Sequence, residues 1–238
     1  MSEPLSHIPT EVYLGFLGRT IEIHWNYHAW FMVGIWLFLV PLCITVIRYF
    51  KPQPTEFGVQ TKISISNPLW WWFNVHKYGL YSAVTLALIG VVVALVVSRG
   101  FSGSVHAIFG IVTVVMGCLQ VVSGMLRGTH GGKYYHKADP NDPSTWHGDH
   151  YDRTVRRRIF EAYHKTTGYF TLFCALGAVG SGLMQYPIPI LTGLVFVVPF
   201  AFLAAWILLE YLERRHDGYR SVHGYGLEHP YNKERELL

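Results

Sequence analysis

Four histidines lie inside long apolar stretches of this 238-residue chain, one to a stretch: His28, His76, His106 and His164. An ionisable side chain in such a stretch is a candidate functional residue, because removing it from water is costly unless it has a partner. Neutral imidazole is a common metal ligand and also ligates haem iron. These residues therefore favour iron ligation within a bilayer.

The stretch from Ser104 to Gly128 keeps its small and polar residues on one face. They recur at alternating steps of four and three: His106, Gly110, Thr113, Gly117, Gln120, Gly124 and Arg127. At about 100° per residue these positions form one narrow stripe along a helix. The rest of the circumference is mostly Ile, Val, Phe, Leu and Met, which suits lipid. A histidine and three glycines on one face could hold a flat group, and haem is the flat group that histidine ligates.

Composition and apolar length predict a membrane protein. The chain is 51% hydrophobic, 16% aromatic and only 14% charged, which is too apolar for a typical soluble domain. Five stretches are long enough to cross a bilayer as helices, at about residues 26–48, 69–97, 104–127, 159–184 and 190–209. We expect an all-α membrane protein: an antiparallel four-helix haem-binding bundle plus one additional transmembrane helix. Pro41 is expected to kink the first span.

The polar segments and the cysteines complete this outline. A segment at 1–25 precedes the transmembrane domain, a loop at 128–158 interrupts it, and a tail at 210–238 follows it. Cys43, Cys118 and Cys174 lie within apolar spans and are expected to be buried thiols. The chain has no CxxCH motif, so we expect haem b held without a covalent bond.

The basic residues predict the orientation. The side holding residues 49–68, the loop at 128–158 and the tail carries most of the lysines and arginines, whereas the other side has only Arg19 and Arg99. The positive-inside bias places the N-terminal segment outside and the loop and tail in the cytoplasm. The net charge of +4 therefore reflects membrane topology, and we expect lipid rather than nucleic acid as the partner of this surface.

Alternating helix direction pairs the four histidines. Each lies near the N-terminal end of its span, so His28 and His106 are expected near the outer face, and His76 and His164 near the inner face. Two imidazoles facing each other across a bundle supply both axial ligands of a haem iron. Two such pairs would form an electron path across the bilayer. His24, one turn before His28, is the alternative ligand in the first span.

Small residues fall in phase with these histidines. From His164 the matching positions include Gly168 and Gly182, and from His76 they include Ala87 and Ala94. A residue 18 positions further on lies ~27 Å away along a helix, toward the opposite face. Each helix is thus predicted to ligate one haem and to offer a groove to the other, with Gly110 and Gly168 beside the ligands. The alternative is that these small residues serve close helix packing without a ligand.

These motifs resemble the cytochrome b561 family of transmembrane dihaem proteins. The span from Ser104 has His-x3-Gly followed by Gln-x3-Gly-x2-Arg, RRRIFEAYHKTTGYF has a second His-x3-Gly, and WWWFNVHKYGLYS and WNYHAW supply the other histidines. The resemblance covers about residues 20–210. It implies four haem-binding helices, two b-type haems and one-electron transfer across the membrane. Eukaryotic members typically use ascorbate and ferric iron, whereas bacterial relatives are linked to quinones or partner dehydrogenases.

Five predicted spans, a longer inner loop and no attached electron-donor domain separate this chain from the six-helix eukaryotic pattern. We therefore expect a bacterial inner-membrane protein with a separate redox partner. Its predicted function is electron transfer between that partner, or a small donor, and a quinone or other acceptor. The open alternatives are a haem subunit of a larger dehydrogenase, a quinone- or ferric-reductase-like oxidoreductase, and a non-redox bundle for metal or proton transport.

Two further groups of residues are candidates for binding. Arg127, Lys77 and Lys165 could neutralise propionates of the inner haem, or could be interfacial charges without a ligand. The loop contains four histidines among four aspartates, His130, His136, His147 and His150 with Asp139, Asp142, Asp149 and Asp152. Imidazole and carboxylate together could bind a transition metal, but the spacing matches no closed zinc pattern. We expect a docking or haem-capping loop.

Overall fold

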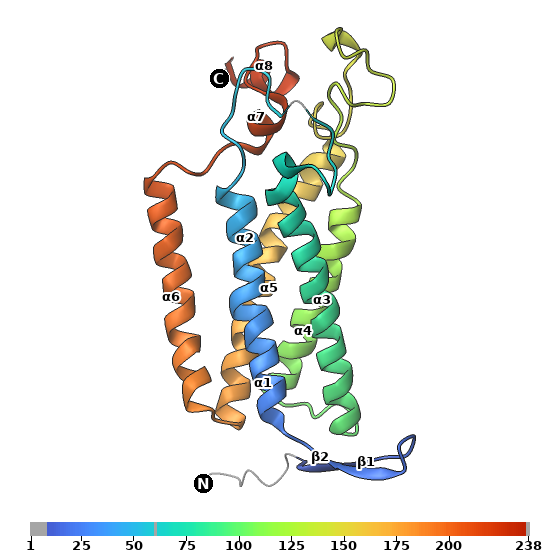
Figure 1. Ribbon diagram of the computed structural model, residues 1–238, viewed down its shortest axis with the longest axis vertical. Coiled ribbons are helices and arrows are strands. Elements are labelled where there is room, and N and C mark those ends of the chain that lie inside the picture. The colour runs from blue at the N-terminus through green and yellow to red at the C-terminus, as the bar shows by residue number, and fades with distance from the viewer. Residues whose placement is uncertain (1–8, 60, 237–238) are drawn as a thin grey trace.

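Five long helices stand side by side in the computed structural model, which describes residues 9–59 and 61–236 (Figure 1). Within those residues, five helical segments are long and apolar enough to cross a membrane: Trp25–Tyr49, Pro68–Val97, Val105–Met125, Val155–Gln185 and Pro189–Tyr211. This is the architecture of a multi-pass, all-α membrane protein. Residues 1–8 of the predicted outer segment and residues 237–238 of the predicted tail lie outside the described part.

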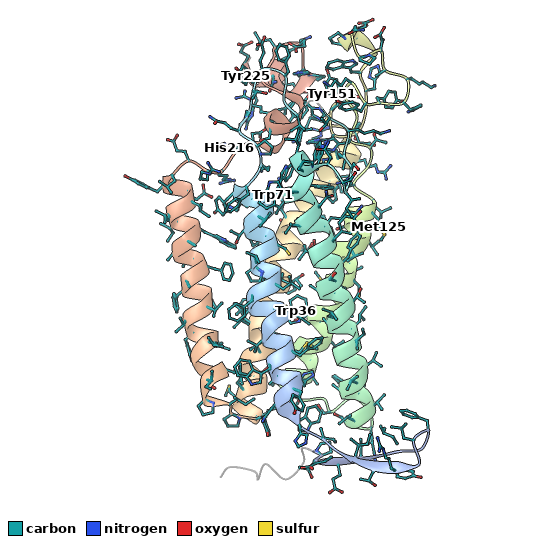
Figure 2. The ribbon with its side chains drawn as sticks, viewed as in Figure 1. Trp36, Trp71, Met125, Tyr151, His216 and Tyr225 are labelled. Carbon is teal, nitrogen blue, oxygen red and sulfur yellow. The ribbon has the colours of Figure 1, made fainter. Side chains whose placement is uncertain are left out.

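The first crossing is interrupted near its middle. It consists of α1 (Trp25–Val33), a π-helical turn at Gly34–Leu39, and α2 (Val40–Tyr49). Pro41 follows the π-helical turn and has no backbone N–H, so it cannot donate the helical hydrogen bond to the carbonyl four residues earlier. Trp36, labelled halfway along the bundle in Figure 2, belongs to this turn. It is buried with Ile35 against Ala83 and Ala87 of the next crossing.

Three further helices complete a four-crossing core: α3 (Trp71–Val97), α4 (Val105–Met125) and α5 (Val155–Gln185). Side-chain caps set where two of them begin. Ser104 Oγ accepts a hydrogen bond from the backbone N–H of Ala107, and Thr154 Oγ1 accepts one from that of Arg157. Such caps satisfy N–H groups that have no partner within the helix. They thereby fix the positions of the histidines on α4 and α5.

The fifth crossing, α6 (Pro189–Tyr211), lies at one flank of the bundle (Figure 1). It carries no histidine and presents Leu191 and Val198 to a buried cluster that includes Val33 and Leu37 of the first crossing. Near its other end, Trp206 Nε1 donates a hydrogen bond of 2.8 Å to Thr45 Oγ1 on α2.

A β-hairpin precedes α1, within the segment at 1–25 that the sequence predicts only as polar. β1 (Glu11–Leu14) pairs antiparallel with β2 (Arg19–Glu22). The short turn between them contains Gly18 at a φ of +61°, a backbone conformation that glycine adopts without strain. We call this end of the molecule the hairpin end.

Three polar segments fold together at the opposite end, and we call them the cap. They comprise residues 50–59 with 61–67, residues 126–154 and residues 212–236. The last of them contains α7 (Gly218–His223) and α8 (Pro230–Glu236). Backbone hydrogen bonds join the tail to the first segment, from Val59 N to Val222 O at 2.9 Å and from Tyr225 N to Thr55 O at 3.1 Å. Figure 2 labels Tyr151 and Tyr225 at this cap end.

Candidate functional site

The hairpin end of the bundle holds one histidine pair. The rings of His28 on α1 and His106 on α4 have centroids 6.2 Å apart and planes at 88°. His106 Nδ1 lies 2.8 Å from the backbone oxygen of Ala178 on α5. A carbonyl can only accept, so the proton is on Nδ1 and the Nε2 lone pair of His106 is available.

A glycine makes this arrangement possible. A Cβ at Gly182 on α5 would lie 2.8 Å from His106 Nδ1 and 2.9 Å from its Cε1. Any larger residue would therefore push the imidazole away from α5. Gly182 is one of the small residues in phase with His164, and the space beside it is occupied by the ring of a histidine of the other pair.

The cap end holds the second pair. The rings of His76 on α3 and His164 on α5 have centroids 6.3 Å apart and planes at 72°. Ser123 Oγ lies 2.8 Å from His164 Nδ1 and donates to Gln120 O at 2.9 Å, and the side-chain amide of Gln120 lies 2.9 Å from the same imidazole nitrogen. His76 Nδ1 lies 3.4 Å from the carbonyl of Cys43. In this pair too, Nδ1 is engaged and Nε2 is left for another partner.

Both ring spacings suit a metal ion between the rings. A metal–imidazole bond of about 2.0 Å places the ring centroid about 3.15 Å from the metal, so two ligands on opposite sides have centroids about 6.3 Å apart. Two imidazoles in edge-to-face contact also fall in the range of 4.5–7 Å. The spacing alone therefore does not separate ligation from stacking, and the surroundings of each pair must decide.

The two pairs lie near opposite faces of the bundle. Ser123, which contacts His164, lies ~26 Å beyond His106 along the axis of α4 at the helical rise of 1.5 Å per residue. The hydrocarbon core of a bilayer is about 30 Å thick. The structure thus brings together the two pairs that alternate helix direction predicts.

The structure separates His28 from the alternative, His24. His24 is exposed and immediately precedes α1, where its ring contacts Tyr27 at a centroid distance of 5.8 Å. The ring of His28 is the one that faces His106.

The glycines of the α4 stripe divide into two kinds. A Cβ at Gly117 would meet Val84 at 3.3 Å, so this glycine serves close helix packing. Cβ positions at Gly110 and Gly124 have no heavy atom within 4 Å, and a Cβ at Gly168 would meet only the Gln120 side chain, at 3.7 Å. These three glycines are near His106 or His164 and leave room for a flat group beside the ring.

The predicted cations lie at the cap end. The guanidinium of Arg127 lies 4.6 Å from the ring centre of Phe73, one helical turn before His76. The ammonium of Lys77 lies 4.8 Å from the ring centre of Tyr78. Lys165 is mostly exposed and forms an ion pair with Glu161 at 3.5 Å. Arg127 and Lys77 are both half-buried, and Arg127 also lines a cavity of the cap.

A third histidine cluster lies in the cap, and the sequence predicts only part of it. His130 and His150 come from the loop, and His223 comes from the end of α7. Among the described residues, these three form the group of potential metal ligands in which one ligand atom of each lies within 4.8 Å of the others. The loop histidines His136 and His147 are exposed and do not belong to it.

Burial keeps these three rings neutral at physiological pH. Burial and the positive charge of neighbours, His223 and then Arg127 for His130, lower the pKa of His130 well below 6.5. Burial does the same to His150, and it lowers the pKa of His223 to about 3. Each neutral ring therefore keeps one nitrogen lone pair that can bind a metal.

The sequence contained only part of the signal for this cluster. Four loop histidines were visible, but His223 is 73 residues beyond His150. Its position depends on α7, which has a local signature: Asp217 Oδ1 caps the N–H groups of Tyr219 and Arg220. Finding α7 would still not have shown that it packs against the loop.

A cavity of about 670 Å³ opens beside the cluster, lined in part by His130, His223, Trp70 and Arg127. This volume is within the range of small-molecule sites, about 300–1,000 Å³.

Comparison of the sequence with protein-family models and with curated proteins, and of the structure with solved structures, found no match.

Proposed function

We propose that the chain transfers electrons across a membrane through two b-type haems, one held by His28 and His106 and the other by His76 and His164. The observation that carries this proposal is the presence of two histidine pairs, with centroid spacings of 6.2 and 6.3 Å, at opposite ends of one apolar four-crossing bundle. When bound, haem supplies reversible one-electron chemistry at iron.

The hydrogen bonds around the pairs support ligation over simple stacking. A histidine that binds a metal through one nitrogen normally donates its other N–H to a carbonyl, hydroxyl or carboxylate. His106 and His76 have such acceptors in Ala178 O and Cys43 O, and Nδ1 of His164 lies 2.8 Å from Ser123 Oγ. Stacking requires no such arrangement of Nδ1.

The protein's own residues position the ligands and admit the group. Gly182 lets His106 lie against α5, and Gly110, Gly124 and Gly168 leave space beside the rings. Arg127 supplies a positive charge at the cap end, where a propionate of the haem held by His76 and His164 would need one. With a pair of imidazoles to hold each haem, the group would supply electron transfer rather than oxygen binding.

The positive-inside bias supports an orientation with the hairpin end outside and the cap in the cytoplasm of a bacterial cell. A donor that gives up one electron and an acceptor that takes it would meet opposite ends of the bundle, so each end would need its own partner. We propose a separate redox protein or small donor and a quinone or other acceptor. This is the arrangement that resemblance to the cytochrome b561 family implies.

An absorption spectrum of the full-length protein, purified from cells with ample porphyrin, tests the proposal. The reduced-minus-oxidised difference should show a sharp α band that carbon monoxide does not change. Haem extraction should give about two haems per chain. A colourless, folded protein would refute the proposal and would favour a bundle that transports a metal ion or protons.

A further inference from the structure

We propose that the cap contains a separate metal site, in which His130, His150 and His223 bind one divalent transition-metal ion of the class that prefers imidazole, such as Zn²⁺ or Cu²⁺. This site goes beyond electron transfer through the membrane pairs. It rests on residues that take no part in those pairs.

Ring spacing is the first observation. Three ligands arranged tetrahedrally around one metal, with centroids about 3.15 Å from it, would have centroids about 5.1 Å apart. The observed centroid distances are 4.9 Å for His130–His150, 5.0 Å for His150–His223 and 5.5 Å for His130–His223. The first two distances are slightly shorter than the expected value and the third is slightly longer.

The ring nitrogens give the same result. Nitrogen ligands of a tetrahedral zinc ion lie about 3.3 Å apart when the Zn–N bond is about 2.0–2.1 Å. His223 Nε2 and His150 Nδ1 are 3.3 Å apart. The widest separation within the group is 4.8 Å, so the remaining adjustment is at most about 1.5 Å, which the broad χ2 torsion of histidine allows.

A hydrogen bond between His150 and His223 explains only part of the cluster. His130 Nε2 is buried and has no hydrogen-bond partner among the described residues. Leaving a buried polar nitrogen unpaired costs roughly 1–3 kcal/mol, and such groups in a native protein call for an explanation. A metal ion that takes the lone pairs of the three histidines would account for the whole set.

The backbone around the loop ligands is closely packed. His150 N donates to Thr129 O at 3.0 Å, next to His130, and Asp149 Oδ2 accepts from Thr129 N at 2.8 Å. A Cβ at Gly131 would lie 2.3 Å from His147 O, so the two arms of the loop approach as only glycine allows. The loop is therefore built to hold His130 and His150 side by side.

The tail ligand is fixed in the same way. The carbonyl of Val222, next to His223, accepts from Val59 N at 2.9 Å. Tyr219 Oη, one turn earlier on α7, donates to Tyr151 O at 2.9 Å. A Cβ at Gly132 would approach His223 Nδ1 to 3.0 Å. Metal binding would thus join the loop to the tail at points that already touch.

The donor set indicates the class of metal. Three neutral imidazoles without a carboxylate in the ligand group suit Zn²⁺, Cu²⁺ or Ni²⁺, whereas Ca²⁺ and Mg²⁺ require oxygen ligands. Three protein ligands leave a fourth position, as in catalytic rather than structural zinc sites. His130 and His223 also line the adjoining cavity, so that position is open to water or a small anion.

Equilibrium dialysis of the full-length protein against Zn²⁺, and separately against Cu²⁺, tests this site by mass-spectrometric metal analysis. We expect about one such ion per chain in addition to haem iron, and at least about 10-fold weaker binding in His150→Ala and in His223→Ala. The matched control is His136→Ala, which removes an exposed histidine of the same loop and should bind like the wild type.

Failure to bind either metal would overturn the proposal, and so would equal loss of binding in the His136→Ala control. If His150→Ala or His223→Ala elutes as an aggregate, His130→Ala replaces it, because His130 is the least buried of the three residues. The result is independent of the haem proposal, since zinc and copper are measured apart from iron. A chain that binds zinc but no haem would keep this inference and refute the other.

Discussion

The histidine pairs of the bundle and the histidine triad of the cap differ in spacing. The pairs have centroids 6.2–6.3 Å apart, as for two ligands on opposite sides of a metal, and the triad has 4.9–5.5 Å, as for a tetrahedral ion. Histidine thus occurs in two spatial arrangements in one chain, widely spaced pairs and a compact triad. The scaffold decides which: helices facing each other across a space produce the wide pairs, and close glycine turns produce the compact triad.

The two regions also differ in how far they depend on each other. The pairs are ~26 Å apart along α4 at the helical rise, and each uses its own Nδ1 acceptor. The triad needs two segments of the cap that meet only when the tail folds back. We therefore expect substitutions in one region to leave ligand binding in the other unchanged, and the following predictions test that separation.

The largest expected effect is the loss of one of the two proposed haems when a histidine of one pair is replaced. His106→Ala removes a ligand at the hairpin end and should lower haem content from about two to about one per chain, because a haem iron with one protein ligand is held weakly. His76→Ala should do the same at the cap end. Haem extraction and zinc dialysis on the same samples measure the outcome. Loss of both haems from a folded His106→Ala protein would show that the sites are not separate.

The histidine pairs of the bundle could be predicted from the sequence, because helix periodicity and helix direction depend on residues that are close together in the chain. Helical periodicity aligned His106 with Gly110 and Gly124, and alternating direction assigned His28 to His106 and His76 to His164. The same reasoning could not choose between His24 and His28, since both lie on one face of the first span. The choice depends on where α1 begins, and the structure begins it after His24.

The cap was not predictable by such rules. Its fold depends on contacts between segments far apart in the chain, such as Val59 with Val222 and Thr55 with Tyr225. The tail was expected to be a polar segment without a strong pattern, because its helices are too short to show periodicity. The hairpin at Glu11–Glu22 does carry a local signal, the glycines Gly15 and Gly18 in its turn.

A smaller effect is expected when the space that Gly182 leaves for the His106 ring is filled. Gly182→Ala places a methyl group within 2.9 Å of the His106 ring, and overpacking of this kind costs about 1–3 kcal/mol, or about 10–100-fold in haem affinity at the hairpin end. Gly180→Ala, on the same helix with no heavy atom within 4 Å of its Cβ position, is the control. Haem titration of both variants checks the difference, and equal affinities would remove Gly182 from the site.

Loss of a hydrogen-bond partner should cost less. Ser123→Ala removes the hydroxyl that lies 2.8 Å from His164 Nδ1, and substitutions of this type weaken metal binding by about 10-fold or more. The cap-end haem alone should be affected, and its reduction potential should shift because the basicity of the imidazole changes. Ser123→Thr retains the hydroxyl and should restore both properties. A redox titration that shows identical shifts in the two variants would contradict the assigned role.

The smallest effect is expected in α6, which belongs to neither region. Trp206→Phe removes one hydrogen bond to Thr45, of 2.8 Å, and should lower the free energy of unfolding by about 0.5–1.5 kcal/mol. Phe200→Leu, an exposed position on the same helix, should leave stability unchanged and serves as the control. Thermal unfolding in detergent measures both. Because α6 packs against the bundle without a histidine of its own, haem and zinc content should remain at wild-type values in both variants. A loss of haem or of zinc would mean that α6 sets the spacing of the histidines. Ligand binding in the bundle and in the cap would then both depend on α6.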